Sequence, residues 1–517
     1  MLKISRDPFL RFTTLILITS SLFSYGTEAR LHYYNDIHNP NSYPEPPYSP
    51  FSQSQPPSIS PDPDDLSQPP SPCQDLDQEV VHDVRNYGAV GDGITDDTDA
   101  FKTAWDSACS NDEDNNTVSI LLVPFGFTFV IHSTIFTGPC RSYQYFQVFF
   151  FFKYQSHFNF YKIIKYCLIS GGFHLINKVD GTIVPRDGPE SWPSGFNKRQ
   201  WLVFYRIKGM ALIGNGVIDG RGQKWWDLPC KPHRNVNKTT ALTGPCESPA
   251  ALRFFMSSNL SMQGVTIKNS PQFHMTFDGC HEVHINSLRI TSPPSSPNTD
   301  GIHIENSNSV EIHNSVISNG DDCVSIGSGS YNIDILNLTC GPGGHGISIG
   351  SLGNQNSRAC VSNITVRDSF IKFSDNGVRI KTWQGGSGSV SGVTFDNIQM
   401  DNVRNPIIID QYYCTSKNCP NKTNAVFVND VVYQSIKGTY DRRSPPMHFG
   451  CSNNVPCVNL TVSDIDLVPS KGEMVVDPFC WNAYGVVDEF SVPSISCLKS
   501  DPSTLLLGGL LGECGVR

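Results

Sequence analysis

The stretch Leu260-Ser-Met-Gln-Gly-Val-Thr-Ile267 places apolar residues at its first, third, sixth and eighth positions. The same spacing returns along the chain every 23 to 34 residues, a period typical of solenoids. Further copies start at Val283, Val310, Ile333, Ile364, Val393, Val426 and Leu460, and those at Val310 and Ile364 have serine at the sixth position. Alternation within each copy, with frequent Asn and Gly and no long 3.6-residue pattern, predicts short strands joined by turns. We therefore expect a parallel β-helix in which each copy adds one rung.

A second alternating strand follows within several repeat units, with paired apolar residues two positions apart. The pairs are Ile302/Ile304, Val324/Ile326, Ile347/Ile349, Val378/Ile380 and Ile407/Ile409. Successive side chains of a strand point to opposite faces, so the residues next to these apolar positions share an outer face. On that face we expect His303, Ser325, Ser348, Arg379 and Lys381.

Short polar motifs stand directly before these strands. Asn298-Thr-Asp300 precedes the first strand, Gly320-Asp-Asp322 the second and Gly344-His-Gly346 the third. Neighbouring strands of a sheet lie about 4.8 Å apart, so stacking the units gathers Asp300, Asp321 and Asp322 into one cluster. The histidine and the cation pair Arg379 and Lys381 would lie alongside. This polar row predicts a groove for acid/base chemistry on a chain-like anionic substrate.

Each motif also has a purely local explanation. Asp and Asn stabilise tight turns and Gly supplies positive φ, so any single Asp near a turn favours turn chemistry. A lone His345 fits an ordinary, partly buried histidine, and Arg379 with Lys381 fits a solvated strand face. Three carboxylates on adjacent rungs, beside a histidine and two cations, instead favour a catalytic site.

In this order and frame, the motifs Asn-Thr-Asp, Gly-Asp-Asp, Gly-His-Gly and Arg379-Ile-Lys381 resemble those of the glycoside hydrolases of the polygalacturonase type. The stretch from Tyr87 to Phe101 also resembles the start of plant members. The resemblance runs from about Asp83 to the C-terminus and is interrupted once. It implies a right-handed, single-stranded parallel β-helix of the pectin lyase-like kind. It also implies inverting hydrolysis of α-1,4 linkages between galacturonic acid units of pectin, with no metal or other cofactor.

Glycosidic hydrolysis takes one carboxylic acid to protonate the leaving oxygen and one carboxylate to activate water or attack the sugar. Crowded like charges raise one pKa and leave the other groups ionised. The resemblance implies that Asp321 is the general acid, while Asp300 and Asp322 stay ionised and hold the water. For an inverting enzyme we expect a carboxylate gap of about 6.5 to 9.5 Å.

The resemblance also implies roles for the neighbouring side chains. His345 is expected to hydrogen-bond the acid and tune it. Arg379 and Lys381 are expected to clamp galacturonate carboxylates, the arginine through a bidentate contact. Tyr413 resembles the family's substrate-contacting tyrosine, although an aromatic core residue fits nearly as well. Plant members have one glycine fewer before His345, so we expect a bulge there and not a lost site.

The chain outside the repeats divides into segments of distinct composition. Residues 1–29 combine basic residues, an apolar stretch and a small-residue exit, which predicts a signal peptide. Residues 30–78 form a Pro/Ser-rich linker, with twelve prolines between residues 39 and 72, and contain too few apolar residues to fold alone. Residues 79–517 are the expected β-helix catalytic domain. No other segment is long enough to span a membrane.

An anomalous insert occupies about residues 143–174. Twelve of the 24 residues from Tyr143 to Tyr166 are aromatic, and the insert interrupts the resemblance between Cys140 and Val179. It contains Cys167, without which the cysteine count of 17 becomes even. We interpret the insert as translated non-coding sequence, such as a retained intron. A genuine aromatic loop that binds sugar or a partner is the alternative.

The cysteines indicate the compartment. Seventeen of them point to an oxidising environment, and they follow no zinc-binding spacing. The expected disulfides are Cys323–Cys340, Cys414–Cys419 and Cys451–Cys457. Seven Asn-x-Ser/Thr sequons are compatible with glycosylation.

The formal charge of −10 argues against nucleic acid as a partner. It also conflicts with a polyanionic substrate unless cations such as Arg379 and Lys381 are concentrated at the groove. We therefore expect a secreted, monomeric enzyme of the mildly acidic cell wall, acting on pectin and without stable membrane association. Two alternatives stay open. A pectate lyase shares the fold but eliminates and typically needs calcium, whereas an inactive pectin-binding wall protein would bind without cleaving. Endo or exo attack and methyl-ester preference are not set by the sequence.

Overall fold

The computed structural model describes residues 78–110, 117–140, 175–192, 199–226, 248–414, 419, 421–472, 475–488, 490–500 and 514. The chain divides after Pro72, and the residues from Cys73 onward form one compact unit. The expected signal peptide (1–29), the aromatic insert (143–174) and, except for Gln78, the linker (30–78) lie outside the described residues. Among the helices that are described, none is long and apolar enough to cross a membrane.

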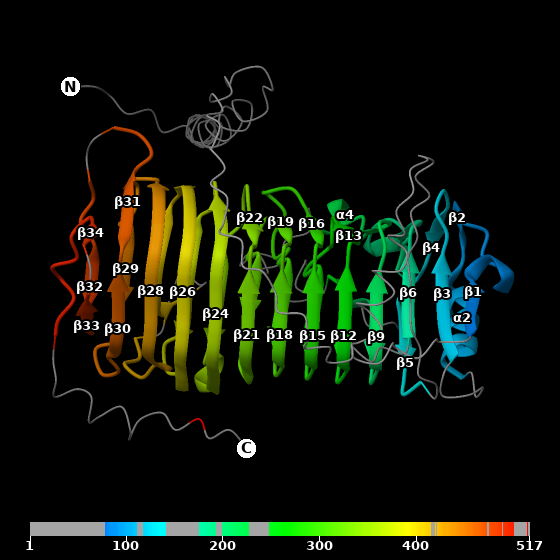
Figure 1. The fold of residues 1–517 in the computed structure, drawn as a ribbon, viewed down its shortest axis with the longest axis horizontal. Helices are drawn as coiled ribbons and strands as arrows, with labels where there is room; N and C mark the ends of the chain where they lie inside the picture. Colours follow the sequence, from blue (N-terminus) through cyan, green and yellow to red (C-terminus); the bar gives the residue numbers. More distant parts are fainter. Residues whose placement is uncertain are drawn as a thin grey trace, which may run out of the picture. The chain divides into compact units, whose positions relative to one another are not determined.

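The described part of the compact unit is a right-handed parallel β-helix, as expected, and every paired strand in its two sheets runs parallel to its neighbours. Its coils follow one another along a single axis from β1 at one end to β34 at the other (Figure 1). An 11-stranded sheet, named here the site sheet, carries the predicted motifs. Its strands are β5 (Thr134–Thr137), β8 (Gln200–Tyr205), β11 (Ala250–Phe255), β14 (Met275–Asp278), β17 (Ile302–Glu305), β20 (Val324–Ile326), β23 (Ile347–Leu352), β25 (Asn376–Trp383), β27 (Asn405–Tyr413), β29 (Met447–Gly450) and β32 (Phe479–Trp481).

A 23-stranded sheet, named here the large sheet, completes the coils. Its strands are β1 (Gln78–Asp83), β2 (Asp92–Asp96), β3 (Thr117–Val123), β4 (Thr128–Val130), β6 (Leu175–Val179), β7 (Thr182–Val184), β9 (Lys208–Ile213), β10 (Val217–Asp219), β12 (Ser258–Gln263), β13 (Thr266–Lys268), β15 (His281–Asn286), β16 (Arg289–Thr291), β18 (Asn308–His313), β19 (Val316–Ser318), β21 (Ser330–Leu336), β22 (Thr339–Cys340), β24 (Arg358–Lys372), β26 (Ser387–Val403), β28 (Phe427–Tyr440), β30 (Cys457–Ser463), β31 (Ile465–Pro469), β33 (Ala483–Val487) and β34 (Ser491–Val492). The described helices are η1 (Val84–Tyr87), α2 (Thr98–Ser110), η2 (Pro189–Ser191), α4 (Gln223–Trp226) and η4 (Asn354–Asn356).

The repeat read from the sequence matches the register of the large sheet in all copies but one. Leu260 pairs with Val283, and the following starts pair in turn up to Val393. The start predicted at Val426 is wrong, because Val393 pairs with Val431, which pairs with Leu460. The true copy has Gly438 at its eighth position, where a Cβ would lie 1.9 Å from the Met400 carbonyl oxygen. Because glycine replaces the last apolar residue of the true copy, the sequence pattern matched an apolar run that begins five residues earlier.

Asparagine turns explain why the repeat is rich in that residue. Asn314 and Asn337 have φ near +50°, a left-handed conformation that asparagine tolerates better than most residues. The Nδ2 of Asn337 donates to the Oδ1 of Asn314 at 2.8 Å, and Asn363 donates likewise to Asn332 at 2.7 Å. The turns therefore link consecutive coils through their side chains as well as their backbone.

The core between the sheets is apolar and, near the N-terminal end, aromatic. Phe204 stacks on Phe254 at a ring-centroid distance of 5.0 Å, and Phe254 stacks on Phe277 at 5.1 Å. These phenylalanines occupy one in-register position on successive strands of the site sheet. Burying one such ring stabilises the fold by roughly 1.5–3 kcal/mol, so a column of them fixes the stacking of the coils.

The segment that resembles the start of plant members caps the N-terminal coil. Asp97 is buried, and its carboxylate accepts hydrogen bonds from the backbone N–H groups of Val90 and Val130 at 2.7 and 3.2 Å. Helix α2 follows directly and buries Phe101 and Trp105 against the core. Covering the end coil keeps its apolar interior out of water and prevents further edge pairing.

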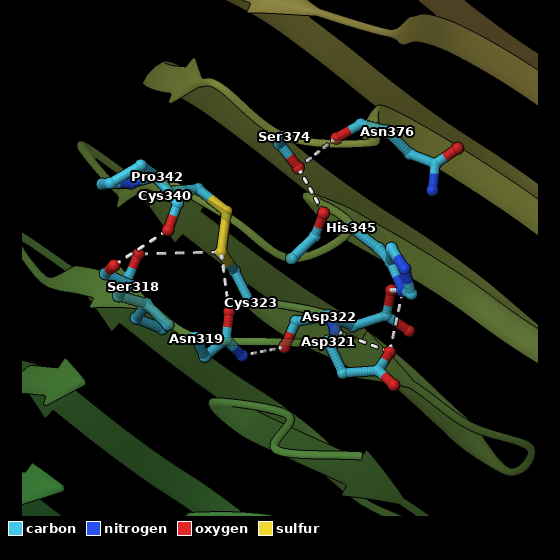
Figure 2. Close-up of a disulfide and its surroundings, with 12 residues drawn as sticks. Ser318, Asn319, Asp321, Asp322, Cys323, Cys340, Pro342, His345, Ser374 and Asn376 are labelled. Atoms are coloured by element: carbon cyan, nitrogen blue, oxygen red, sulfur yellow. Dashed lines mark hydrogen bonds and ion pairs between the residues drawn. A yellow bond between two sulfur atoms is a disulfide. The ribbon is translucent and has the colours of Figure 1, made fainter. Parts of the chain in front are cut away.

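The three expected disulfides are confirmed: Cys323–Cys340, Cys414–Cys419 and Cys451–Cys457. Three more pairs were not expected, and they are Cys109–Cys140, Cys360–Cys514 and Cys480–Cys497. The bridge between Cys323 and Cys340 joins two neighbouring coils beside the aspartate motifs (Figure 2). Cys280 is a free, buried thiol.

Candidate active site

The outward face of the site sheet carries the side chains that the alternation placed there. The five apolar pairs are buried, and they pair in register from β17 to β27. His303 consequently pairs with Ser325, Ser325 with Ser348, and Ser348 with Arg379. The expected outer row is therefore confirmed. Several of its members are nevertheless buried, because the neighbouring turns and side chains cover them.

The aspartates lie in the turns that enter β17 and β20, and the backbone fixes these turns to one another. Gly301 donates its N–H to the carbonyl oxygen of Asp322 at 2.9 Å, and His345 donates its N–H to that of Asp321 at 3.0 Å. The buried Asn319 side chain donates to the carbonyl oxygen of Asp322 at 2.8 Å (Figure 2). The carboxylates are thus held by rigid turns on adjacent rungs.

Asp322 is the electrostatic centre of the site. Its carboxylate accepts from the Arg379 guanidinium at 2.6 Å, from Lys381 Nζ at 2.7 Å and from Ser348 Oγ at 2.8 Å. Burial alone would raise the pKa of Asp322, but the charges of Lys381 and Arg379 outweigh it and lower the pKa to about 2. Asp322 is therefore ionised in mildly acidic and in neutral solution.

Asp300 has a different environment from Asp322. It is buried, and it accepts one hydrogen bond from Ser325 Oγ at 2.7 Å. Burial, followed by the negative charges of Asp321 and Asp322, raises the pKa of Asp300 well above its ordinary value. Both cations are bound to Asp322, and among the described residues Asp300 has no comparable ion pair to offset these effects. Asp300 therefore binds a proton more readily than an ordinary aspartate does.

Asp321 is the most accessible of the three carboxyl groups. Its side chain is 20% exposed, whereas that of Asp322 is 2% exposed. The Nδ1 of His345 lies 2.9 Å from Asp321 Oδ1, and the imidazole is itself 32% exposed (Figure 2). A group that exchanges a proton with substrate must be accessible to the substrate. Asp321 and His345 both meet this condition.

Two glycines position His345. Gly344 and Gly346 have φ of +70° and +69°, and a Cβ on them would lie 2.2 Å from the Asp321 carbonyl oxygen and 2.1 Å from the Gly377 carbonyl oxygen, respectively. Only glycine permits this close approach without strain. The extra glycine before His345 is therefore accommodated in the turn, and the site is kept.

Tyr413 is not a core residue. It is half-buried at the end of β27, and its ring centroid lies 5.5 Å from Lys381 Nζ, within cation–π distance. It also packs edge-on against Trp383. The structure therefore places Tyr413 beside the predicted site residues.

The sequence did not reveal which side chains contact and support Asp300. Ser325 Oγ lies between His303 Nδ1, at 2.8 Å, and Asp300 Oδ2, at 2.7 Å. His274 is fully buried, and its Nδ1 lies 3.0 Å from the Asp300 carbonyl oxygen. Burial lowers the pKa of His274 to about 4, so its ring is neutral and Nδ1–H donates. The alternation placed His303 and Ser325 on the outer face, but only their distances to Asp300 reveal this chain of contacts.

A family profile described as "Glycosyl hydrolases family 28" matches residues 114–479, which include every site residue named above. The chain belongs to this family. It is therefore a glycoside hydrolase, and its β-helix and motif order are those that the resemblance implied.

Relatives within family 28 extend over most of the chain. A probable polygalacturonase of Arabidopsis thaliana is 39% identical, over 83% of this chain and 86% of the relative. A polygalacturonase of Cryptomeria japonica is 41% identical, over 82% of this chain and 73% of the relative. The solved exopolygalacturonase of Thermotoga maritima has a TM-score of 0.57 at 18% identity, covering 80% of this chain and 92% of that one. At that identity the structural likeness shows the shared fold.

Asp321, Asp322 and His345 form one close cluster in the family 28 site. An oxygen of each aspartate and a nitrogen of His345 all lie within 4.8 Å of one another. Adjacent positions in one turn hold the two carboxyl groups together.

The same three groups are the described cluster that could hold a metal ion. Both Asp322 oxygens, however, already bind cationic side chains, at 2.6 and 2.7 Å. A cation would have to displace Arg379 or Lys381 to use them. The donor set of this family 28 site therefore fits acid/base chemistry better than metal binding.

Proposed function

We propose that this glycoside hydrolase is a polygalacturonase that cleaves α-1,4-galacturonosidic linkages of pectin with inversion. The observation that carries the proposal is the pairing of a buried, cation-bound Asp322 with an accessible Asp321 next to His345. This arrangement sets an ionised carboxylate beside a carboxyl group that substrate can reach, as glycosidic hydrolysis requires. The relatives named polygalacturonases support the substrate.

In the proposed mechanism Asp321 protonates the glycosidic oxygen that leaves. Asp322 acts as the base that accepts a proton from water, because its pKa of about 2 keeps it ionised. Asp300 orients the same water, and its raised pKa makes it the weaker acid of the pair. His345 hydrogen-bonds Asp321 and holds it toward the groove.

Arg379 and Lys381 are proposed to serve two purposes. They keep Asp322 ionised, and they present their remaining N–H groups to a galacturonate carboxylate. An arginine has five donors and a lysine three, so the contacts to Asp322 and Ser348 leave donors on both side chains. Tyr413, next to Lys381, is proposed to contact the sugar ring.

The direct test is product analysis on polygalacturonate. Hydrolysis yields new reducing ends, no product that absorbs in the ultraviolet, and full activity in chelator. An unsaturated product whose formation stops in chelator would identify a lyase instead. Binding to pectin without any reducing sugar released would identify the non-enzymatic alternative. The length distribution of the products distinguishes endo from exo attack.

The wild-type activity is expected to peak in the mildly acidic range. Burial and the neighbouring carboxylates raise the pKa of Asp300, so it loses its proton at a higher pH than an ordinary carboxyl group does. The added negative charge then opposes binding of a polyanion, and activity falls. On the acid side, Asp322 remains ionised down to about pH 2. Measuring kcat/KM on an oligogalacturonate against pH at constant ionic strength checks this, and an optimum above neutral contradicts it.

Ser325→Ala is expected to change the pH dependence through Asp300. The hydroxyl hydrogen bond lowers the pKa of Asp300, so its loss raises that pKa and moves the alkaline limb of the profile to higher pH. We expect kcat to fall about tenfold, since a hydrogen bond to the reacting group is lost. The control is Ser330→Ala, which removes a buried hydroxyl that has no hydrogen-bond partner among the described residues. An unmoved limb in Ser325→Ala would contradict the role of this contact.

We further propose that the protein is secreted to the cell wall. The support is the composition of residues 1–29 as a signal peptide, the Pro/Ser-rich segment 30–78 as a linker, and the six disulfides of the described residues. We propose a monomer acting on pectin, with no stable membrane association.

Transcript sequencing across residues 143–174 tests the interpretation of the aromatic insert, because abundant message that encodes it would contradict a retained intron.

A further inference from the structure

The outward face of the site sheet continues past the catalytic rungs to the last strand, β32. Figure 1 shows β29 and β32 together at the C-terminal end of the coil stack. Two rows of outward positions run in register from β25 through β27 and β29 to β32. The first row is Arg379, Ile408, His448 and Phe479, and the second is Lys381, Asp410, Gly450 and Trp481.

Both rows end in exposed aromatic side chains. Trp481 is 53% exposed and Phe479 is 42% exposed, while Tyr412 on β27 is 36% exposed. Inward-facing neighbours on these strands, such as Phe449, are fully buried. The exposed aromatic residues therefore stand on the same face as Arg379 and Lys381.

Neighbouring side chains already hold these three rings in place. Trp481 Nε1 donates to Asn453 Oδ1 at 2.7 Å, and the Tyr412 hydroxyl donates to the same oxygen at 3.2 Å. Phe479 stacks on His448 at a ring-centroid distance of 4.7 Å. The rings are thus anchored before any ligand binds, and what remains exposed is mainly apolar ring surface.

We propose that Trp481, Phe479 and Tyr412 form a stacking subsite for the galacturonate chain beyond the cleavage point, on the side of β32. This rests on the proposed function and adds to it a second place where the polymer is held. The subsite is named here the aromatic platform. Pre-anchored aromatic rings offer a flat apolar contact to pyranose faces with little loss of side-chain entropy.

Distance and charge both favour a polysaccharide as the occupant. Three rung steps separate β25 from β32, which is about 14 Å and spans a few linked sugar units. The intervening Asp410 is partly buried, and burial raises its pKa, so in mild acid it opposes a polyanion less than a free carboxylate would. Gly450 has no side chain at its outward position between Lys381 and Trp481, and the His448 ring lies over that position, with Nε2 2.9 Å from where a Cβ would be.

The test is binding measured against chain length, with no turnover needed. Calorimetry with digalacturonate, tetragalacturonate and hexagalacturonate is carried out on the Asp321→Asn protein with and without Trp481→Ala. We expect Trp481→Ala to lower the affinity for hexagalacturonate about tenfold, which is the effect of losing an aromatic anchor. The affinity for digalacturonate is expected to stay unchanged. Trp481→Phe keeps a ring without the donor to Asn453 and is expected to recover most of the affinity.

The matched control is Phe125→Ala, an aromatic residue that is 83% exposed on the turn between β3 and β4, outside the site sheet. The proposed aromatic platform would be overturned if Trp481→Ala lowered the affinity for all three oligogalacturonates equally, or lowered none of them. A wild-type dimer that Trp481→Ala dissociates, seen by light scattering, would assign the surface to a second copy instead. Normal length-dependent binding together with no hydrolysis by the wild type would contradict the proposed function and leave the platform supported.

Discussion

Asp321→Asn is expected to lower kcat on polygalacturonate by about 10²- to 10⁴-fold, because an amide cannot donate the proton that the leaving oxygen needs. The side chain is partly exposed and contacts His345 through one oxygen, so the substitution leaves the buried ion pairs of Asp322 intact. The thermal unfolding midpoint is therefore expected to stay close to that of the wild type. Reducing-end assays and circular dichroism on the same preparation measure both quantities.

Asp278→Asn is the matched control for this substitution. Asp278 also lies on the outer face of the site sheet, is 22% exposed, and pairs with Arg253 at 2.8 Å. Removing its charge changes the field of the groove without touching the three aspartates. We expect it to change kcat only slightly. A near-normal rate in Asp321→Asn, or an equal loss in Asp278→Asn, would remove Asp321 from the role of general acid.

Asp322→Asn is expected to abolish hydrolysis and also to destabilise the fold. The substitution leaves Arg379 and Lys381 buried without their anion, and breaking a buried pair from one side typically costs about 3–5 kcal/mol. Asp322 has a pKa of about 2 in the folded chain, below its ordinary value of 3.8. It therefore stabilises the fold above pH 3.8, and this contribution is lost as the pH falls through about 2. Urea unfolding at two pH values measures the difference.

The control for Asp322→Asn is a carboxylate that also has two partners but lies near the surface. Asp334 contacts Arg367 at 3.1 Å and His313 at 2.9 Å, and its side chain is 31% exposed. Solvent screens such a pair, so Asp334→Asn is expected to cost less than about 1 kcal/mol. Similar destabilisation by the two substitutions would show that the ion pairs of Asp322 are worth no more than surface contacts.

Local patterns predicted a large part of the fold. The apolar spacing that starts at Leu260 returns in register on successive strands, since a strand alternates its side chains whatever surrounds it. The pattern failed at Val426, where a longer apolar run allowed two alignments. The spacing alone does not distinguish these alignments. The structure adopts the one in which Val393 pairs with Val431 and Gly438 packs against the backbone at Met400 of the preceding coil.

The candidate site was predictable in membership but not in charge distribution. The motif order gathered Asp300, Asp321 and Asp322, and the alternation brought in the two cations. Nothing in the spacing showed that both cations would bind Asp322, 57 and 59 residues away from it in the chain. That choice depends on burial and on distances of 2.6 and 2.7 Å, which exist only once the coils have stacked.

The sequence by itself determined the period of the β-helix, the face on which each side chain lies and the meeting of three aspartates, because these depend on strand alternation and repeat length. Only the tertiary structure decided how the aspartates differ in pKa. Two buried cations lower the pKa of Asp322, whereas burial and two like charges raise the pKa of Asp300. A pKa is set by the solvent and charges within a few ångströms, and residues far apart in the chain supply them.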